Sequence, residues 1–394
     1  MNNFLNRQAF FADGTPFYRL YTADGAEAAG YSVRLRFRTA KDNAASVMVV
    51  TDCVRAKMHK SFSERNFDYY ETVLHYPECG TNYYFEIAGI GTSEERITAV
   101  YNKRSAMDGA QDYYNFKFYP DFKTPDWAKG AVFYQIFTDR FCNGDPSNDV
   151  LDHEYSYVKL HSEQEKDWGA YPHNMDVCHF YGGDLQGIMD KLDYLQDLGV
   201  EVLYLNPIFV SPSNHKYDIQ DYDYVDPHFG RIVDDEGDVL VEGDMDNRHA
   251  GRYIRRVTNK KNLEASNEFF IQFVEEVHRR GMKVILDGVF NHCGSFNKWM
   301  DSERIYEGQE DYEPGAYVDE KSPYRSFFKF FSENWPYNKD YDGWWGHDTL
   351  PKLNYEDSES LCDYILRIGQ KWVSPPYNTD GWRLDVAADL GYSP

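Results

Sequence analysis

The sequence has too little positive charge for a protein that binds nucleic acid or docks on an anionic membrane. It carries 41 Lys and Arg against 65 Asp and Glu, a formal net charge of −24. Such a surface repels phosphate backbones and anionic lipid headgroups. No apolar run is long enough to span a bilayer, and the first residues, MNNFLNRQAF, lack the basic and apolar segments of a signal peptide. We therefore expect a cytoplasmic protein without nucleic-acid or membrane partners.

Cysteine is scarce and scattered. The six cysteines stand at positions 53, 79, 142, 178, 293 and 362, and none forms a CxxC pair. Together with the missing export signal, this spacing favours free thiols over disulfides and argues against a metal site built on cysteine. A Gly-rich phosphate loop is also missing after the first predicted strand of the second half, which weakens a nucleotide-binding interpretation.

Aromatic residues, by contrast, are abundant. The 394 residues include 33 Tyr, 26 Phe and 8 Trp. Rings in this number supply a packed core, and they also serve as stacking platforms for the apolar faces of ligands such as sugars. The length suggests two or three domains, or a small domain beside a barrel.

Residues 1–122 are predicted to form a small β-sandwich. In 31–38 (YSVRLRFR) apolar and basic residues alternate, which places Val33, Leu35 and Phe37 on one face. Further short strands are expected at 46–51, 69–76, 82–88 and 113–119, without a convincing helix between them. The stretch 119–127 (YPDFKTPDW), with its two prolines, is typical of a linker.

Residues 123–394 show a repeating strand–helix pattern. Continuous apolar runs at 131–137, 200–205, 283–286 and 381–386 are typical of strands buried on both faces. An amphipathic helix precedes each of the last three, with apolar residues repeating at helical spacing through 188–198, 269–277 and 361–372. The pattern predicts a parallel sheet.

Loop lengths favour a (β/α)8 barrel of which the first four strands are present. Helix-to-strand links are short, whereas the strand-to-helix connections run over roughly 138–184, 206–265 and 288–357. Barrels of this kind carry their active sites at the C-terminal ends of their strands. A doubly wound open sheet would show the same alternation and stays open as an alternative.

Polar residues at these strand ends are candidates for chemistry. The third strand runs into Asp287, Asn291 and His292, and the fourth carries Arg383 and Asp385, two residues apart and thus on the same side. In a barrel these side chains would share one pocket. A carboxylate kept ionised by arginine suits attack on an electrophilic carbon. A buried structural Asp–Arg pair is an equally reasonable interpretation of the same residues.

Four segments resemble the alpha-amylase family, glycoside hydrolase family 13. GMKVILDGVFNHCG and DGWRLDVA resemble its first two signature regions, and YLNPIF resembles the end of its second strand. LPKLN resembles a motif of the neopullulanase, cyclomaltodextrinase and maltogenic amylase branch. The resemblance runs from Trp127 onward and implies a barrel preceded by a starch-binding-type β-sandwich.

The resemblance also implies roles for individual residues. Asp385 would be the catalytic nucleophile of a retaining α-glucan hydrolase and Arg383 its positioning partner. Asp287 and His292 would bind the sugar at the cleavage site. The segment HKYD adds Tyr217 as a stacking platform and His215 as a polar neighbour. The expected substrates are maltodextrins, cyclodextrins, pullulan or starch, cleaved at α-1,4 links through a covalent glycosyl-Asp intermediate.

A calcium loop is the second implied site. DRFCNGDPSND (139–149) and YGGD (181–184) contain closely spaced oxygen donors, which a hard cation requires. The resemblance implies a structural Ca²⁺ held by Asn143, Asp145, Asn148, Asp149, Gly182 and Asp184. Without it, these residues would be read as an ordinary turn rich in Asn and Asp.

The resemblance covers only the N-terminal part of the family's catalytic domain. Its acid/base Glu follows the fifth strand and its third catalytic Asp follows the seventh, so we expect the sequence to be part of a longer enzyme. Half a barrel exposes two sheet edges, and this chain alone is expected not to hydrolyse glucans. The alternative is an inactive relative that binds glucan or protein. The branch also implies a homodimer of the full-length protein.

Overall fold

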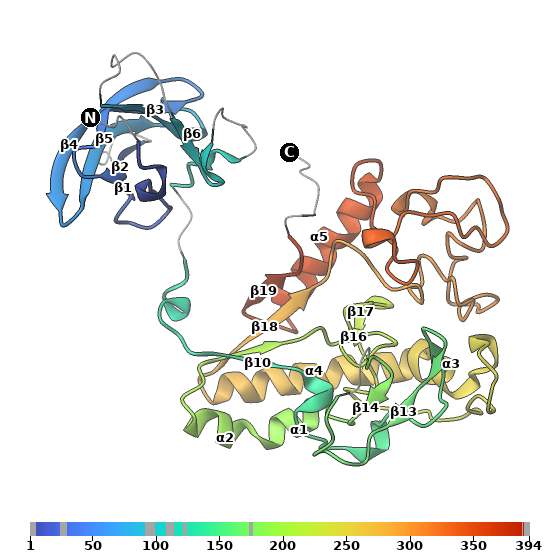
Figure 1. Cartoon of the computed structure of the whole chain (residues 1–394). Coiled ribbons are helices and arrows are strands. Elements are labelled where there is room, and N and C mark those ends of the chain that lie inside the picture. The colour runs from blue at the N-terminus through green and yellow to red at the C-terminus, as the bar shows by residue number, and fades with distance from the viewer. Residues whose placement is uncertain are drawn as a thin grey trace. The chain divides into compact units, whose positions relative to one another are not determined.

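A computed structural model describes residues 5–23, 30–90, 99–107, 114–120, 124–172, 176–387 and 389 (Figure 1). The chain divides into two compact units, Met1–Asp126 and Trp127–Pro394, and each is described by itself. The predicted domain boundary between residues 122 and 123 touches residues 121–123, which lie outside the described part. Over the described ranges, every helix is too short or too polar to cross a bilayer.

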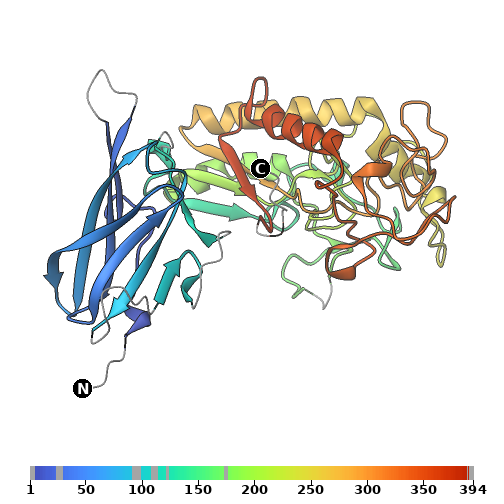
Figure 2. The same cartoon turned by 90° about the horizontal axis from the view of Figure 1, so that it is seen from above.

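The first unit is an antiparallel β structure (Figure 2). Its strands pair in the order β1-β2-β5-β4-β3-β6-β7-β8, with β9 added to β6. A short 3-10 helix, Arg7–Ala9, precedes them. The strands are β1 (Arg19–Ala23), β2 (Tyr31–Ala40), β3 (Ala44–Thr51), β4 (Arg55–Glu64), β5 (Phe67–Tyr76), β6 (Asn82–Gly89), β7 (Ala99–Asn102), β8 (Ser105–Met107) and β9 (Phe116–Lys117).

The predicted strands at 31–38, 46–51, 69–76 and 82–88 are confirmed as β2, β3, β5 and β6. Of the strand predicted at 113–119, β9 is observed, and residue 113 lies outside the described ranges. Strand β4 was not predicted. Only its Met58 is buried, so it lacks the apolar alternation that marks a strand in sequence.

The core of the first unit follows the alternation in β2. Val33, Leu35 and Phe37 are fully buried, and the ring of Phe37 stacks on that of Phe85 from β6, with centroids 4.6 Å apart. The opposite face of β2 is not simply solvated. The Arg36 guanidinium lies 4.0 Å from the centroid of the Phe17 ring and also pairs with Glu71.

The second unit contains a four-stranded parallel sheet. Its strands are β10 (Phe133–Ile136), β15 (Val202–Leu205), β18 (Lys283–Gly288) and β19 (Gly381–Leu384), and they pair in this order. Each strand of the sheet therefore pairs with the strand that comes before it in the sequence. A doubly wound sheet reverses its strand order at a switch point, and these four strands show no such reversal. The order is the one expected for consecutive strands of a barrel.

The predicted helices before the last three strands are confirmed. Their apolar faces share one buried cluster with the parallel sheet, in which Leu195, Phe273 and Trp372 pack with Leu203 and Leu286. Helix α4 also contacts α1 (Figure 1). The helices are α1 (Leu185–Asp190), α2 (Leu192–Asp197), α3 (Gly251–Thr258), α4 (Lys260–Arg279) and α5 (Glu359–Val373). Burial of each large side chain contributes about 1.5–3 kcal/mol.

The long strand-to-helix connections hold the remaining elements of this unit. They are three small two-stranded sheets, formed by β11 (Ser156–Tyr157) with β12 (Leu160–His161), β13 (Glu163–Gln164) with β14 (His179–Phe180), and β16 (Phe209–Val210) with β17 (Asp221–Val225). Short 3-10 helices in these connections span Thr138–Arg140, Pro146–Asn148, Asn247–His249, Arg325–Phe327 and Trp344–Gly346, and a further one, Asp126–Ala128, precedes β10. All of the predicted site residues lie in these connections or at the strand ends that feed them.

Candidate active site

Two neighbouring strands place Asp287 beside Arg383. The two residues are register partners between β18 and β19, so their side chains leave the sheet at the same level. The Arg383 guanidinium donates from Nη1 to Asp287 Oδ1 at 3.0 Å and to Asp385 Oδ1 at 2.6 Å. The Asp287 carboxylate is buried, whereas the Arg383 side chain is 42% exposed and that of Asp385 14%. Asp385 is thus held next to a buried anion by one shared cation and stays within reach of a ligand.

The Asp287 carboxylate is fixed by two further donors. The hydroxyls of Tyr204 and Tyr217 donate to its Oδ2 at 2.5 and 2.8 Å. Burial raises the pKa of Asp287, and the hydrogen bonds from the two tyrosines and Arg383 counteract part of that rise. Burial and the neighbouring Asp287 also raise the pKa of Tyr204 to about 12, so both phenols remain donors.

His292 is buried against an indole. Its ring stacks on Trp344, with centroids 4.9 Å apart and planes inclined by 13°. Burial lowers the pKa of His292, while the charge of Asp385 and a hydrogen bond to the Tyr217 backbone act in the opposite direction. The imidazole is therefore neutral near pH 7, and it faces the same space as Asp385 and Tyr217.

The segment LPKLN (350–354) fixes the backbone around His292. His292 and Lys352 form an isolated antiparallel bridge, and Cys293 N donates to the Pro351 carbonyl at 3.0 Å. Leu353 N donates to the Asn291 carbonyl at 3.1 Å. The residues after β18 are thereby tied to a segment sixty positions further along the chain.

His215 and Tyr217 are positioned by a tight loop. The Tyr217 backbone N–H donates to His215 Nδ1 at 3.1 Å, and the two rings are 5.9 Å apart. Between them, Lys216 adopts a positive φ of 60° and points inward, where its ammonium pairs with Asp226 at 2.7 Å. Burial lowers the pKa of His215, so this imidazole is neutral as well. The structure thus brings together all six residues predicted for catalysis and substrate binding.

Two residues of this site were not predicted. Tyr204 lies inside the apolar run of β15, where an aromatic side chain reads as core. Trp344 lies in the long connection after β18, where no sequence periodicity indicates its place; it covers His292, and its Nε1–H donates to Asp389 at 3.1 Å. Its neighbour Trp345 is 82% exposed and stacks on it at 5.1 Å.

The predicted calcium residues also gather in one place, around the loop 143–149. Asn143 Nδ2 donates to Asp149 Oδ1 at 2.8 Å, and Gly182 adopts a φ of +77°, so that an added Cβ would lie 2.5 Å from that same carboxylate oxygen. Among the described residues, the amide oxygens Oδ1 of Asn143 and Asn148 are buried without a hydrogen-bond partner. Buried amide oxygens without a donor beside a carboxylate fit a cation that prefers oxygen ligands.

Two members of the predicted calcium set are engaged elsewhere. Asp184 is fully buried, and its carboxylate accepts from the backbone N–H groups of Gly144, Asp145 and Gly187, the last at the start of α1. The Asp145 carboxylate pairs with Arg231 at 2.6 Å. The oxygens best placed for an ion are therefore those of Asn143, Asn148 and Asp149.

Fold and site together define a class of protein. It is a parallel α/β domain with an arginine-bridged pair of carboxylates at the C-terminal ends of its strands, where barrel enzymes hold their catalytic groups. Two neutral histidines and several aromatic rings surround the pair. Such a set of side chains suits a neutral, hydroxyl-rich ligand rather than an anion.

Comparison with known proteins identifies the family. The family described as "Alpha amylase, catalytic domain" matches residues 135–241 and 265–393, and "Alpha amylase, N-terminal ig-like domain" matches residues 23–120. The chain belongs to the alpha-amylase family, in its neopullulanase, cyclomaltodextrinase and maltogenic amylase branch. The predicted family and the predicted order of a β domain followed by a parallel α/β catalytic domain are confirmed.

Relatives with known names are longer than this chain. Neopullulanase 2 of Thermoactinomyces vulgaris is 34% identical over 85% of the chain and 47% of that protein. The intracellular maltogenic amylase of Bacillus subtilis is 35% identical over 74% of the chain and 39% of that protein. The type III pullulan hydrolase from Thermococcus kodakarensis superposes with a TM-score of 0.55 at 26% identity, covering 95% of the chain and 55% of that structure. The chain spans about half or less of the length of such relatives.

Proposed function

We propose that this chain belongs to a retaining α-glucan hydrolase that cleaves α-1,4-glucosidic bonds in maltodextrins, cyclodextrins, pullulan or starch. The observation that carries the proposal is the Arg383 guanidinium, which bridges the accessible carboxylate of Asp385 and the buried carboxylate of Asp287. Membership of the alpha-amylase family supports the substrate class.

In the proposed mechanism Asp385 is the nucleophile. Its carboxylate oxygen forms a bond to the anomeric carbon while the bond from that carbon to the leaving oxygen breaks, and water later hydrolyses the glycosyl ester. The proton for the leaving oxygen comes from a carboxylic acid in the part of the longer relatives that this chain does not match. Arg383 donates to Asp385 Oδ1 and thereby fixes the orientation of the nucleophile.

The other cleft residues bind the sugar. The buried Asp287 carboxylate orients Tyr204, Tyr217 and Arg383 around the sugar through the hydrogen bonds that it accepts from them. His292 and His215, both neutral, exchange hydrogen bonds with hydroxyls without attracting anions. The ring of Tyr217 offers an apolar face to the pyranose ring. These interactions place the anomeric carbon against Asp385.

We also propose a structural Ca²⁺ held by Asn143, Asn148 and Asp149, with the Gly182 carbonyl and, in a weaker role, Asp145 and Asp184. Such an ion would tie the loop after β10 to the turn before α1. The unpartnered amide oxygens of Asn143 and Asn148 support this proposal.

Covalent labelling tests the assignment of Asp385. A 5-fluoro-α-glucosyl fluoride loses fluoride without needing a proton, so it reports the nucleophile independently of the acid. In the full-length protein we expect the mass of one fluoroglucosyl group on the peptide that contains Asp385, and no labelling of Asp385→Asn. Asp363→Asn, an exposed carboxylate on α5 outside the site, is the matched control and should label normally. Labelling of a different carboxylate would refute the assignment.

The 394-residue chain alone is expected not to hydrolyse starch or maltosides, because the acid is proposed to lie outside it. Release of reducing sugar from starch by the pure chain would contradict this. If the full-length protein binds glucans but neither hydrolyses nor is labelled, the alternative of an inactive binding relative holds instead.

A further inference from the structure

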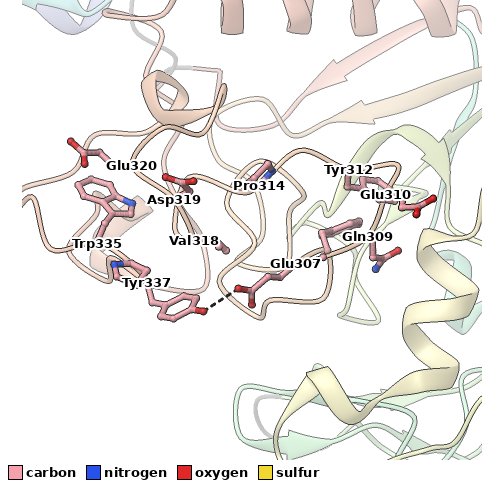
Figure 3. A pocket seen from close by; sticks show the side chains of 13 residues that line it. Glu307, Gln309, Glu310, Tyr312, Pro314, Val318, Asp319, Glu320, Trp335 and Tyr337 are labelled. Carbon is pink, nitrogen blue, oxygen red and sulfur yellow. Dashed lines mark hydrogen bonds between the residues drawn. The ribbon is translucent and has the colours of Figure 1, made fainter.

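A second cavity lies in the connection between β18 and α5, lined by residues between Tyr306 and Tyr337 (Figure 3). Its volume is about 710 Å³, within the range of small-molecule sites in proteins. In Figure 3, Trp335 and Tyr337 lie on one side of it and Gln309 and Tyr312 on the other. None of the proposed catalytic, sugar-binding or calcium residues lines this cavity.

The two rings on the first side are held in fixed orientations. Trp335 donates from Nε1 to the Ala316 carbonyl at 2.9 Å, and the Tyr337 hydroxyl donates to Glu307 Oε1 at 3.0 Å. Tyr337 has a positive φ of 65°, which is uncommon for an aromatic residue. Because both rings are already held in one orientation, a ligand that packs on them causes little further loss of side-chain conformational entropy.

The polar lining accepts hydrogen bonds and repels anions. Glu307, Glu310, Asp319 and Glu320 all line the cavity, and all four are exposed. A phosphate or carboxylate ligand is therefore disfavoured. Hydroxyl groups, by contrast, can donate to these carboxylates while the C–H faces of a sugar ring pack on an indole or phenol.

A cationic ligand is less well matched than a neutral one. The Arg304 guanidinium lies 4.0 Å from the centroid of the Tyr337 ring, and that of Arg325 lies 4.7 Å from the Trp335 ring. Arg304 also pairs with Glu307 at 2.6 Å. Arg304 and Arg325 thus already make cation–π contacts with both rings, and Arg304 already neutralises the charge of Glu307.

We infer that this cavity binds a neutral oligosaccharide at a site separate from the catalytic cleft. That the oligosaccharide is an α-glucan rests on the proposed function. The same connection carries Trp344, which stacks on His292, so a single loop holds both a wall of the cleft and the second sugar site. Binding here retains a long substrate near the cleft without taking part in bond cleavage.

Calorimetric titration with maltotriose, cellotriose and spermidine tests this inference. The 394-residue chain carrying His292→Ala, which weakens the cleft, should still bind maltotriose. Adding Tyr337→Ala should weaken that binding about ten-fold or more, because one stacking platform is lost. Tyr171→Ala removes an exposed ring that does not line the cavity and should change nothing.

A second pair of variants covers the case in which Tyr337→Ala fails to fold. Glu310→Lys places a long side chain on the exposed wall and should weaken binding, whereas Glu313→Lys, on the same loop but outside the lining, should not. Unchanged maltotriose binding in Glu310→Lys, or binding of spermidine in place of sugars, would overturn the inference. Binding of cellotriose alone would keep a neutral-sugar site and count against the α-glucan assignment, which the labelling of Asp385 tests separately.

Discussion

The indole of Trp344 lies nearly parallel to the imidazole of His292, at a centroid distance of 4.9 Å. His292 is only 2% exposed, and burial lowers its pKa. Trp344, fifty-two positions later in the chain, covers one face of the ring and so contributes to this burial. A neutral imidazole beside the proposed nucleophile can bind a sugar hydroxyl without competing with Arg383 for the Asp385 carboxylate.

Replacing Trp344 by Ala should raise the pKa of His292. The substitution admits water to the imidazole ring, which stabilises the imidazolium. The negative charge of Asp385 also raises the pKa of His292, and less burial then opposes that effect. The pKa of His292 is lower in the folded chain than in the unfolded chain. At pH values between these two pKa values, the unfolded chain binds more protons than the folded chain. Stability therefore falls as pH drops below about 6.5, and Trp344→Ala should reduce this fall.

Titration of the His292 Cε1 proton by NMR measures this shift. Trp345→Ala is the matched control, since it removes an adjacent and far more exposed indole but leaves Trp344 on the ring. Equal pKa values of His292 in the two variants would show that the stacked indole does not control the protonation of His292.

Removing Arg383 should destabilise the fold through Asp287. In Arg383→Ala the buried carboxylate keeps its two tyrosine donors but loses Arg383, its one cationic partner among the described residues. The expected loss is about 1–3 kcal/mol in the free energy of unfolding. In the Arg383→Ala background, Asp287→Asn should recover part of it, because the uncompensated charge is gone.

Urea unfolding of the two single variants and the double variant gives the coupling energy of this pair. Arg367→Ala is the control, because Arg367 is exposed and its Nε donates to a backbone carbonyl, that of Asp363, at 3.3 Å. Strictly additive effects of Arg383→Ala and Asp287→Asn would argue against a direct electrostatic coupling.

A buried chain of charges connects two of the long connections, 138–184 and 206–265. The Lys216 ammonium pairs with Asp226 at 2.7 Å, and His228 lies between Asp226 and Glu154, at 2.7 and 2.8 Å. Arg256 completes the chain with a contact to Glu154 at 2.8 Å. Although burial alone would lower the pKa of His228, the two carboxylates outweigh it and raise the pKa above the ordinary value.

His228→Gln should therefore cost about 3–5 kcal/mol of stability at pH 6, because two buried carboxylates lose a shared cation. For a histidine with a raised pKa, the stabilisation is fully present below the unfolded pKa of about 6.5. It is lost as pH rises through the folded pKa, so the gap between wild type and variant should narrow at high pH. Unfolding free energies at several pH values measure this gap, with the exposed His249→Gln as control. A gap that widens with pH would contradict the charged state of His228.

Much of the site could be predicted because the geometry of two neighbouring strands determines where its charged residues lie. Arg383 and Asp385 stand two apart on a strand, and Asp287 ends the neighbouring strand, so period-2 alternation and strand order already place them together. Tyr204 and Trp344 could not be found in this way. An aromatic residue in an apolar run reads as core, and Trp344 reaches His292 through a long connection whose path has no sequence periodicity.

The charge network and the second cavity were missed for a related reason. His228 and Glu154 lie on loops and Arg256 lies in α3, and the contacts among these three residues depend on the tertiary path of the chain. In the first unit, β4 was missed since only one of its side chains is buried. The apolar face of β2, by contrast, was predicted correctly from its alternation.

Added calcium should raise the melting temperature of the chain if the loop 143–149 holds the ion. A ligand that binds only the folded state stabilises it by RT ln(1 + [L]/Kd). We expect a higher midpoint in millimolar CaCl2 than in EGTA, and we expect Asp149→Ala to abolish the difference. Asp145→Asn should reduce it less, because the Asp145 carboxylate is already paired with Arg231.

Differential scanning calorimetry with and without calcium makes this comparison, and Asp152→Ala, three residues beyond Asp149, is the matched control. Asn143→Ala should also weaken the response, since it removes one of the two buried amide oxygens that lack a partner among the described residues. Asn143→Ala removes only a side chain and is expected to leave the backbone conformation at Gly182 unchanged. A calcium response that survives both Asp149→Ala and Asn143→Ala would place the ion elsewhere and leave these oxygens as parts of an ordinary turn.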